Sequence, residues 1–191
     1  MNLPNKLTLL RILLVPVFMV CATQAFHPGW MLAAGIVFAL ASFTDYLDGH
    51  LARKWNMVTD FGKFADPLAD KLLTTTAFLY MMKMGACDPI VLVIILAREF
   101  AVSGLRMVAA GSGHVIAANM WGKVKTVLQM VTVLVFYFGL AIELWMGDAH
   151  AASACKMQIV GWGLCWVVAA VTLLSGVIYL WQNRECINTA K

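Results

Sequence analysis

Six long apolar segments constrain this chain more than any other feature of its sequence. They cover about Leu7–Phe26, Trp30–Asp48, Leu68–Met84, Pro89–Ala110, Met120–Met146 and Met157–Trp181. Each approaches the roughly 20 residues that an α-helix needs to cross the hydrocarbon core of a bilayer. Since 62% of the 191 residues are hydrophobic and only 13% are charged, the chain has too little polar surface for a water-soluble globule. We therefore predict one all-α integral membrane domain over residues 1–191, with six transmembrane helices.

The positions of Lys and Arg predict the orientation. Six crossings place both termini on one side of the membrane, together with the connections that follow the second and fourth helices. Apart from Arg98, which lies within a segment, only Lys83 and Lys156 fall on the other side. Because basic connections face the cytoplasm, we expect a multi-pass cell-membrane protein with cytoplasmic termini. The first segment lacks a small-residue cleavage site, so we expect it to be retained. The scattered basic residues do not suggest nucleic acid as a partner.

The five cysteines form no metal-binding or redox pattern, because none are spaced as CxxC. Cys87 and Cys155 both fall on the predicted outer side. The sequence leaves two interpretations open for them: a disulfide, or separate thiols in apolar surroundings.

Carboxylates are concentrated in residues 45–72, which hold five of the ten acidic residues. Spacings of i, i+3, i+4, i+7 and i+8 place one set on a single helix face: Asp45, Asp48, Gly49, Ala52 and Arg53. Spacings of four place a second set on another helix face: Gly62, Asp66 and Asp70. Pro67 leaves two helix starts open, one at Asp66 and one earlier with a kink. A short bend joins the helices, so we expect four aspartates to converge at the cytoplasmic end of the bundle.

Four clustered carboxylates repel one another, and near a membrane they need a compensating cation. Carboxylate oxygens suit hard divalent ions such as Mg²⁺, Mn²⁺ or Ca²⁺, and two such ions can clamp a phosphate ester or anhydride. Gly49 and Ala52 leave room for a bulky ligand, although small residues on a membrane helix also serve close helix packing. Arg53 ends the stripe with a bidentate donor for phosphate.

The complete pattern resembles the signature of the CDP-alcohol phosphotransferase family. It reads Asp45-x2-Asp48-Gly49-x2-Ala52-Arg53-x8-Gly62-x3-Asp66-x3-Asp70. The stretches LPNKLTLLRI, AREFAVSGLR and GKVKTVLQM resemble the phosphatidylglycerophosphate synthase branch of that family. The likeness thus covers nearly the whole chain up to the sixth segment. One departure is Ala65, where the family pattern has a larger aliphatic residue, but this change removes no ligand.

The resemblance implies a six-helix membrane fold, a homodimer, and a polar cavity that opens to the cytoplasm among membrane lipids. It implies that Asp45, Asp48, Asp66 and Asp70 bind two Mg²⁺ or Mn²⁺ ions. It also implies that Asp70 is the catalytic base, which takes the proton of the acceptor hydroxyl. The implied donor substrate is CDP-diacylglycerol, from which CMP leaves. Its binding residues are expected to be Asn5, Gly49, Ala52, Arg53 and Thr59.

The acceptor that the resemblance implies is sn-glycerol 3-phosphate, whose phosphate dianion needs basic partners. The candidates are Arg98, Arg106, Lys123 and Lys125. The last three also fit the positive-inside rule without any ligand. Arg98 lies well within its segment, so it should face the interior and pair with an acid or a ligand phosphate. The adjacent Glu99 points about 100° away on a helix, and we expect no facing pair between the two.

Two alternative functions stay open. A sibling CDP-diacylglycerol-dependent transferase, such as a cardiolipin, phosphatidylserine or phosphatidylinositol-phosphate synthase, shares the core motif. A divalent-cation transporter would explain the carboxylates, but an arginine beside a cation path would oppose transport, and Arg53 lies on the same helix face as the aspartates.

Overall fold

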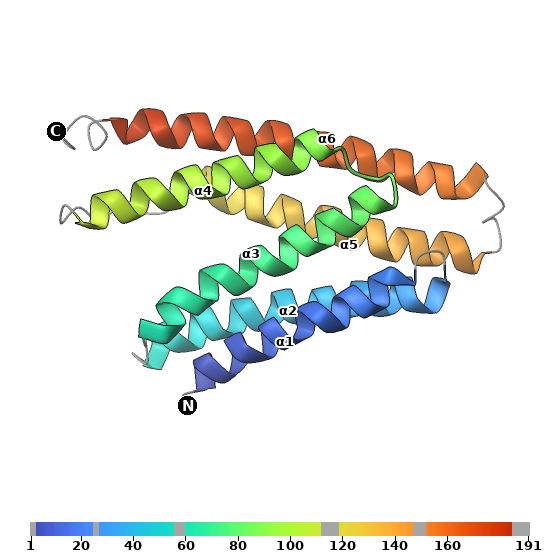
Figure 1. The fold of residues 1–191 in the computed structure, drawn as a ribbon, viewed down its shortest axis with the longest axis horizontal. Coiled ribbons are helices and arrows are strands. Elements are labelled where there is room, and N and C mark those ends of the chain that lie inside the picture. Colours follow the sequence, from blue (N-terminus) through green and yellow to red (C-terminus); the bar gives the residue numbers. More distant parts are fainter. Residues whose placement is uncertain (1–2, 25–26, 56–59, 112–118, 147–151, 185–191) are drawn as a thin grey trace.

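The computed structural model contains six α-helices and no strand in the residues it describes, which are 3–24, 27–55, 60–111, 119–146 and 152–184 (Figure 1). Within these ranges, side chains are described except at 3–7, 45–55, 60–67, 70, 110–111 and 152–155. The helices are α1 (Leu3–Thr23), α2 (Pro28–Trp55), α3 (Asp60–Lys83), α4 (Pro89–Gly111), α5 (Met120–Trp145) and α6 (Ala152–Gln182). The predicted all-α class is confirmed.

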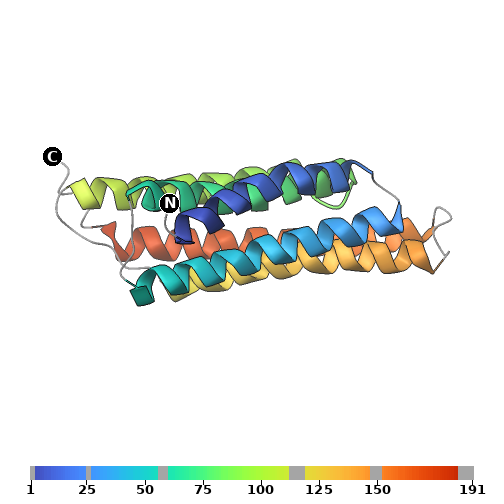
Figure 2. The same ribbon diagram turned by 90° about the horizontal axis from the view of Figure 1, so that it is seen from below.

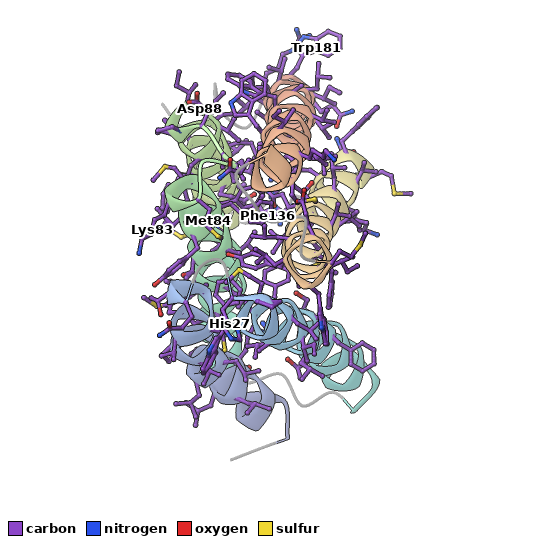
Figure 3. The ribbon with its side chains drawn as sticks, turned by 90° about the vertical axis from the view of Figure 1, so that its right-hand side faces the viewer. His27, Lys83, Met84, Asp88, Phe136 and Trp181 are labelled. Atoms are coloured by element: carbon purple, nitrogen blue, oxygen red, sulfur yellow. The ribbon has the colours of Figure 1, made fainter. Side chains whose placement is uncertain are left out.

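The helices run alternately up and down the bundle and form two layers. One layer holds α1, α3 and α4, and the other holds α2, α5 and α6 (Figures 2 and 3). Across the layers, α1 packs on α2 and α4 packs on α6. The start of α1 and the end of α6 lie at the same end of the bundle, where α2 also ends and α3 begins (Figure 1). We call this the motif end, and the opposite end the turn end.

Local sequence explains where the helices begin and end. Asp88 caps α4, because its Oδ1 accepts a hydrogen bond from the backbone N–H of Ile90 at 2.8 Å, and Pro89 suits the first helical position. Asn119 caps α5 through the N–H of Trp121. Gly85 has φ 76° in the turn after α3, a conformation that costs other residues about 1–2 kcal/mol. Gly85, Asp88 and Pro89 together make the connection between α3 and α4 short.

The core is apolar and aromatic toward the turn end. Phe18 of α1 lies 5.3 Å from Tyr137 of α5 and 6.1 Å from Phe38 of α2, measured between ring centroids. Phe136 is fully buried and points between the two layers, as Figure 3 shows from the turn end. These rings join α1, α2 and α5 into one packed unit.

The outward faces of the helices are apolar as well. Exposed large side chains include Leu13, Phe43, Val93, Val127 and Leu174, each more than half exposed. Two helical stretches are long and apolar enough to cross a membrane by length and composition, Met120–Trp145 and Lys156–Gln182. Contiguous exposed apolar surface of this kind is typical of contact with lipid or with a partner protein.

Candidate active site

The aspartate motif lies on two consecutive helices. α2 extends to Trp55 and α3 begins at Asp60, so both halves of the motif are helical, as their spacing predicts. α3 passes through Pro67, which agrees with the earlier of the two helix starts that the sequence left open. α2 contacts α3, and the two motif-bearing helix ends lie together at the motif end (Figure 1).

Most of the predicted ligands fall outside the described side chains. These are Asn5, Asp45, Asp48, Gly49, Ala52, Arg53, Asp66 and Asp70, while Thr59 lies outside the described residues altogether. Cys155 is also outside the described side chains, so its pairing with Cys87 is not tested; Cys87 itself is a buried free thiol. Among the side chains that are described, no three His, Cys, Asp or Glu are grouped closely enough to hold a metal ion. The two-metal site and the nucleotide pocket stay predictions.

The first described side chain after the motif, Lys71, belongs to a charged cluster. Its Nζ lies 4.0 Å from Glu99 Oε2 on α4 and donates a hydrogen bond to Ser103 Oγ at 2.6 Å. Lys125 of α5 donates to Glu99 Oε1, and the Nη1 atom of Arg98 lies 3.4 Å from the same oxygen. Glu99 therefore interacts with one cation from each of three helices.

A small polar cavity of about 50 Å³ adjoins this cluster. Its lining residues come from α3, α4 and α5: Lys71, Thr74, Thr75, Ile95, Leu96, Glu99, Lys125, Thr126 and Gln129. The helices α3 and α4, which both contribute lining residues, diverge toward the motif end (Figure 1). The size of the cavity is sufficient for a few water molecules. The interior of the bundle is thus polar beside the motif and apolar further away.

Arg98 lies between three helices. Its side chain is 11% exposed, and its Nη2 donates to Ser175 Oγ on α6 at 2.8 Å. A Cβ atom at Gly122 would lie 3.3 Å from Nη2, and one at Gly176 would lie 3.1 Å from Cγ, so the glycines make room for the guanidinium. Arg98 faces the interior as predicted, and of the two partners that the sequence left open, an acid or a ligand phosphate, the structure shows an acid. That acid is the adjacent Glu99, so the expectation of no facing pair between the two residues is wrong.

The other predicted acceptor-site cations have different surroundings. Arg106 is exposed, donates from Nε to the Tyr179 hydroxyl at 3.0 Å and stacks on that ring. Lys123, at the start of α5, is exposed. Lys125 is 5% exposed and bound to Glu99. The four candidates thus divide into two buried cations in the Glu99 cluster and two accessible cations near the helix ends.

Sequence reasoning missed two charged residues inside the bundle. Glu99 is the shared partner of three cations, and Arg11 of α1 is fully buried. Both carried the same signal, a charge within an apolar segment, which in a membrane protein marks an interior position. Two partners of Glu99 could not be found in this way, because Lys71 and Lys125 come from other helices.

Comparison with known proteins places the chain in a family. The sequence model of the CDP-alcohol phosphatidyltransferase family matches residues 1–178. The chain is 41% identical to a CDP-diacylglycerol–glycerol-3-phosphate 3-phosphatidyltransferase of Bacillus subtilis, over 99% of this chain and 98% of the relative. It is 38% identical to the enzyme of the same name from Rickettsia felis, over 93% of each chain.

A third relative supports the same branch. The chain is 36% identical to a probable phosphatidylglycerophosphate synthase of Mycobacterium tuberculosis, over 92% of this chain and 85% of the relative. The family resemblance seen in the aspartate motif is thereby confirmed, and the branch indicated by the other stretches agrees with these names. The chain belongs to the CDP-alcohol phosphatidyltransferase family.

Proposed function

We propose that the protein transfers the phosphatidyl group of CDP-diacylglycerol to sn-glycerol 3-phosphate, giving phosphatidylglycerol phosphate and CMP. The observation that carries this proposal is the complete aspartate motif on the adjoining ends of α2 and α3. Near-full-length relatives named for this transferase activity support it. The product makes the protein an enzyme of phospholipid biosynthesis.

Asp45, Asp48, Asp66 and Asp70 are the residues that would hold two Mg²⁺ or Mn²⁺ ions. The donor set fits these ions, because it consists of carboxylate oxygens alone and the helical spacing puts each pair on one face. When bound, the ions would neutralise the negative charge of the pyrophosphate. Asn5, Gly49, Ala52, Arg53 and Thr59 are proposed to bind the nucleotide part of CDP-diacylglycerol.

Asp70 is proposed to act as the general base. Its carboxylate would take the proton of the acceptor hydroxyl as that oxygen attacks the phosphorus attached to diacylglycerol. The new O–P bond would form while the bond to CMP breaks, and CMP would leave with the electron pair. Asp70 directly precedes Lys71, whose side chain is held by Glu99 and Ser103. These contacts restrict the movement of the helical turn that carries Asp70, which suits a residue that must be positioned to accept a proton.

Basic side chains at the motif end are proposed to hold the phosphate of the acceptor. Arg106 and Lys123 are exposed and able to meet a soluble substrate. Arg98 and Lys125 are buried against Glu99, so they would not contact the acceptor directly. They would add positive electrostatic potential from inside the bundle. Together these four cations favour an anionic acceptor over a neutral or cationic one.

We further infer that all six helices cross the membrane, with the motif end and both termini in the cytoplasm. The exposed apolar side chains on every outward helix face support this arrangement. The concentration of Lys and Arg at the motif end supports the orientation. A homodimer is proposed on the family resemblance.

The test is an acceptor assay. Purified protein in detergent is given CDP-diacylglycerol, Mg²⁺ and one acceptor at a time, and CMP release is measured. We expect release with sn-glycerol 3-phosphate only. Release with serine, inositol phosphate or phosphatidylglycerol instead would assign a sibling activity. Divalent-ion flux into liposomes without any CMP would replace the transferase by a transporter.

A further inference from the structure

Glu99 is a single carboxylate among three cations. Its side chain is 17% exposed, and its partners are Lys71 on α3, the neighbouring Arg98, and Lys125 on α5. Lys125 is the most buried of the three cations, with 5% of its side chain exposed. Among the side chains that the structure describes, this cluster has three cations and one carboxylate, so the cations repel one another and the attraction of each to Glu99 opposes that repulsion.

Removal of Glu99 would therefore act on all three helices at once. Removal of one partner of a buried ion pair is strongly destabilising, because the remaining charge loses part of its compensation. Lys125, which is 5% exposed and bound to Glu99, would lose that contact. Among the described residues, Glu99 is the carboxylate that holds Lys71 and Lys125 on the same site.

The cluster is connected to the aspartate motif through Lys71. This residue follows Asp70 directly and is held by Glu99 and by Ser103, which lie one helical turn apart on α4. α3 and α4 diverge toward the motif end (Figure 1), and these polar contacts connect the two helices. Because a helix is rigid over one turn, the anchor of Lys71 also fixes the height and rotation of the turn that carries Asp70.

We propose that Glu99 is a positioning residue for the transfer reaction: through Lys71 and Lys125 it holds the Asp70 turn of α3 in register with α5. This inference rests on the proposed function, because it assigns Asp70 to the reacting centre. Glu99 itself touches neither substrate. Its effect reaches the chemistry through the placement of the aspartates.

The first measurement compares Glu99→Gln with Glu143→Gln. Glu143 is a partly buried carboxylate on α5 at the turn end, and its Oε2 accepts no hydrogen bond from the residues that the structure describes, so it controls for the loss of a charge. We expect kcat per folded enzyme to fall about 10- to 100-fold in Glu99→Gln, the scale of a small misplacement of reacting groups. KM for CDP-diacylglycerol should change much less. Glu143→Gln should retain wild-type kcat.

A double-mutant cycle tests whether Glu99 acts through Lys125. Once Lys125→Met has removed the cation, Glu99→Gln should lower kcat by a clearly smaller factor than in the wild type, since groups in one network are not additive. Equal factors in both backgrounds would overturn the proposed route. If Glu99→Gln does not fold, Glu99→Asp keeps the charge but shortens the side chain, and carries the same measurements.

A second readout needs neither turnover nor acceptor. Mn²⁺ affinity, measured by electron paramagnetic resonance, should weaken about tenfold in Glu99→Gln, since metal sites depend on the groups that orient their ligands, and should be unchanged in Glu143→Gln. Equal Mn²⁺ affinity in the two variants would overturn the proposal, and a lower unfolding temperature alone would make Glu99 purely structural. A wild-type protein that binds Mn²⁺ but releases no CMP would instead refute the proposed function. The Mn²⁺ affinities of Glu99→Gln and Glu143→Gln would still test the positioning role of Glu99.

Discussion

The two ends of the bundle are held together by different forces. At the turn end, α1, α2 and α5 meet through a cluster of aromatic rings, and Gln158 of α6 donates to the backbone carbonyl of Met84 at 2.8 Å. Toward the motif end, α3 and α4 diverge (Figure 1), and the residues that line a small cavity include Lys71, Glu99 and Lys125. Close apolar packing gives one end stability without chemistry. At the other end, charged side chains such as Lys71, Glu99 and Lys125 take the place of part of that apolar packing, and charged groups of this kind can bind ligands.

The largest expected effect at the motif end comes from metal removal. Exhaustive chelation with EDTA should abolish CMP release, because four uncompensated carboxylates would repel one another and the pyrophosphate. Added Mg²⁺ or Mn²⁺ should restore the activity. The unfolding temperature should change little, since the aromatic core at the turn end needs no ion. Full activity without metal would contradict the two-ion site.

The next largest effect is expected for Asp70→Asn, which keeps the shape of the side chain but removes its basicity. Turnover should fall about 10²–10⁴-fold, the usual contribution of a general base, while CDP-diacylglycerol still binds. Asp88→Asn makes the same chemical change at the turn end. It should leave turnover unchanged, because asparagine also caps a helix. Near-normal turnover of Asp70→Asn would exclude this residue as the base.

The turn end can be weakened without touching the chemistry. Phe136→Ala removes a fully buried ring and should lower the free energy of unfolding by about 3–5 kcal/mol. KM and kcat of the remaining folded enzyme should stay close to wild type. Phe43→Ala truncates a ring that is 58% exposed and serves as the control, with little effect in detergent. A large loss of kcat in folded Phe136→Ala would mean that the two ends are not independent.

The smallest expected effect concerns the turn itself. Gly85→Ala places a side chain at φ 76° and should cost about 1 kcal/mol of stability. Gly104→Ala adds the same methyl group within α4, where the added Cβ would meet no described atom outside the local helix backbone within 4 Å, and should stabilise slightly. In thermal unfolding, the midpoint temperature should fall for Gly85→Ala and rise slightly for Gly104→Ala. Equal shifts would show that the backbone angle of Gly85 is not limiting.

The sequence predicted the helices to different accuracy for identifiable reasons. α4 and α5 were predicted to within one residue at each end, because Pro89, Gly111, Asn119 and Gly147 interrupt the chain there. α2 continues seven residues beyond the predicted span, to Trp55, and α3 begins eight residues before it, at Asp60. Hydropathy follows only the apolar part of a helix. The spacing of the aspartates, in contrast, predicted that these polar extensions are helical.

The cluster around Glu99 could not be predicted in the same way. The sequence left an acid or a substrate phosphate open as the partner of Arg98, left a substrate phosphate or the positive-inside rule open as the explanation of Lys125, and gave Glu99 no partner. Their actual contact depends on how α3, α4 and α5 are rotated about their axes. No local pattern encodes that rotation, because it results from the packing of the whole bundle.

The hydrogen bond between Arg98 and Ser175 bears on the order in which the chain is assembled. Its two partners are separated by 77 positions. At the usual rates of protein synthesis, Arg98 is made roughly 4–15 s before Ser175. During this interval the guanidinium has Glu99 beside it but lacks the groove formed with Gly176. In the proposed membrane arrangement, nascent α4 would therefore stay close to the insertion machinery, or to helices already made, until α6 arrives and completes the bundle.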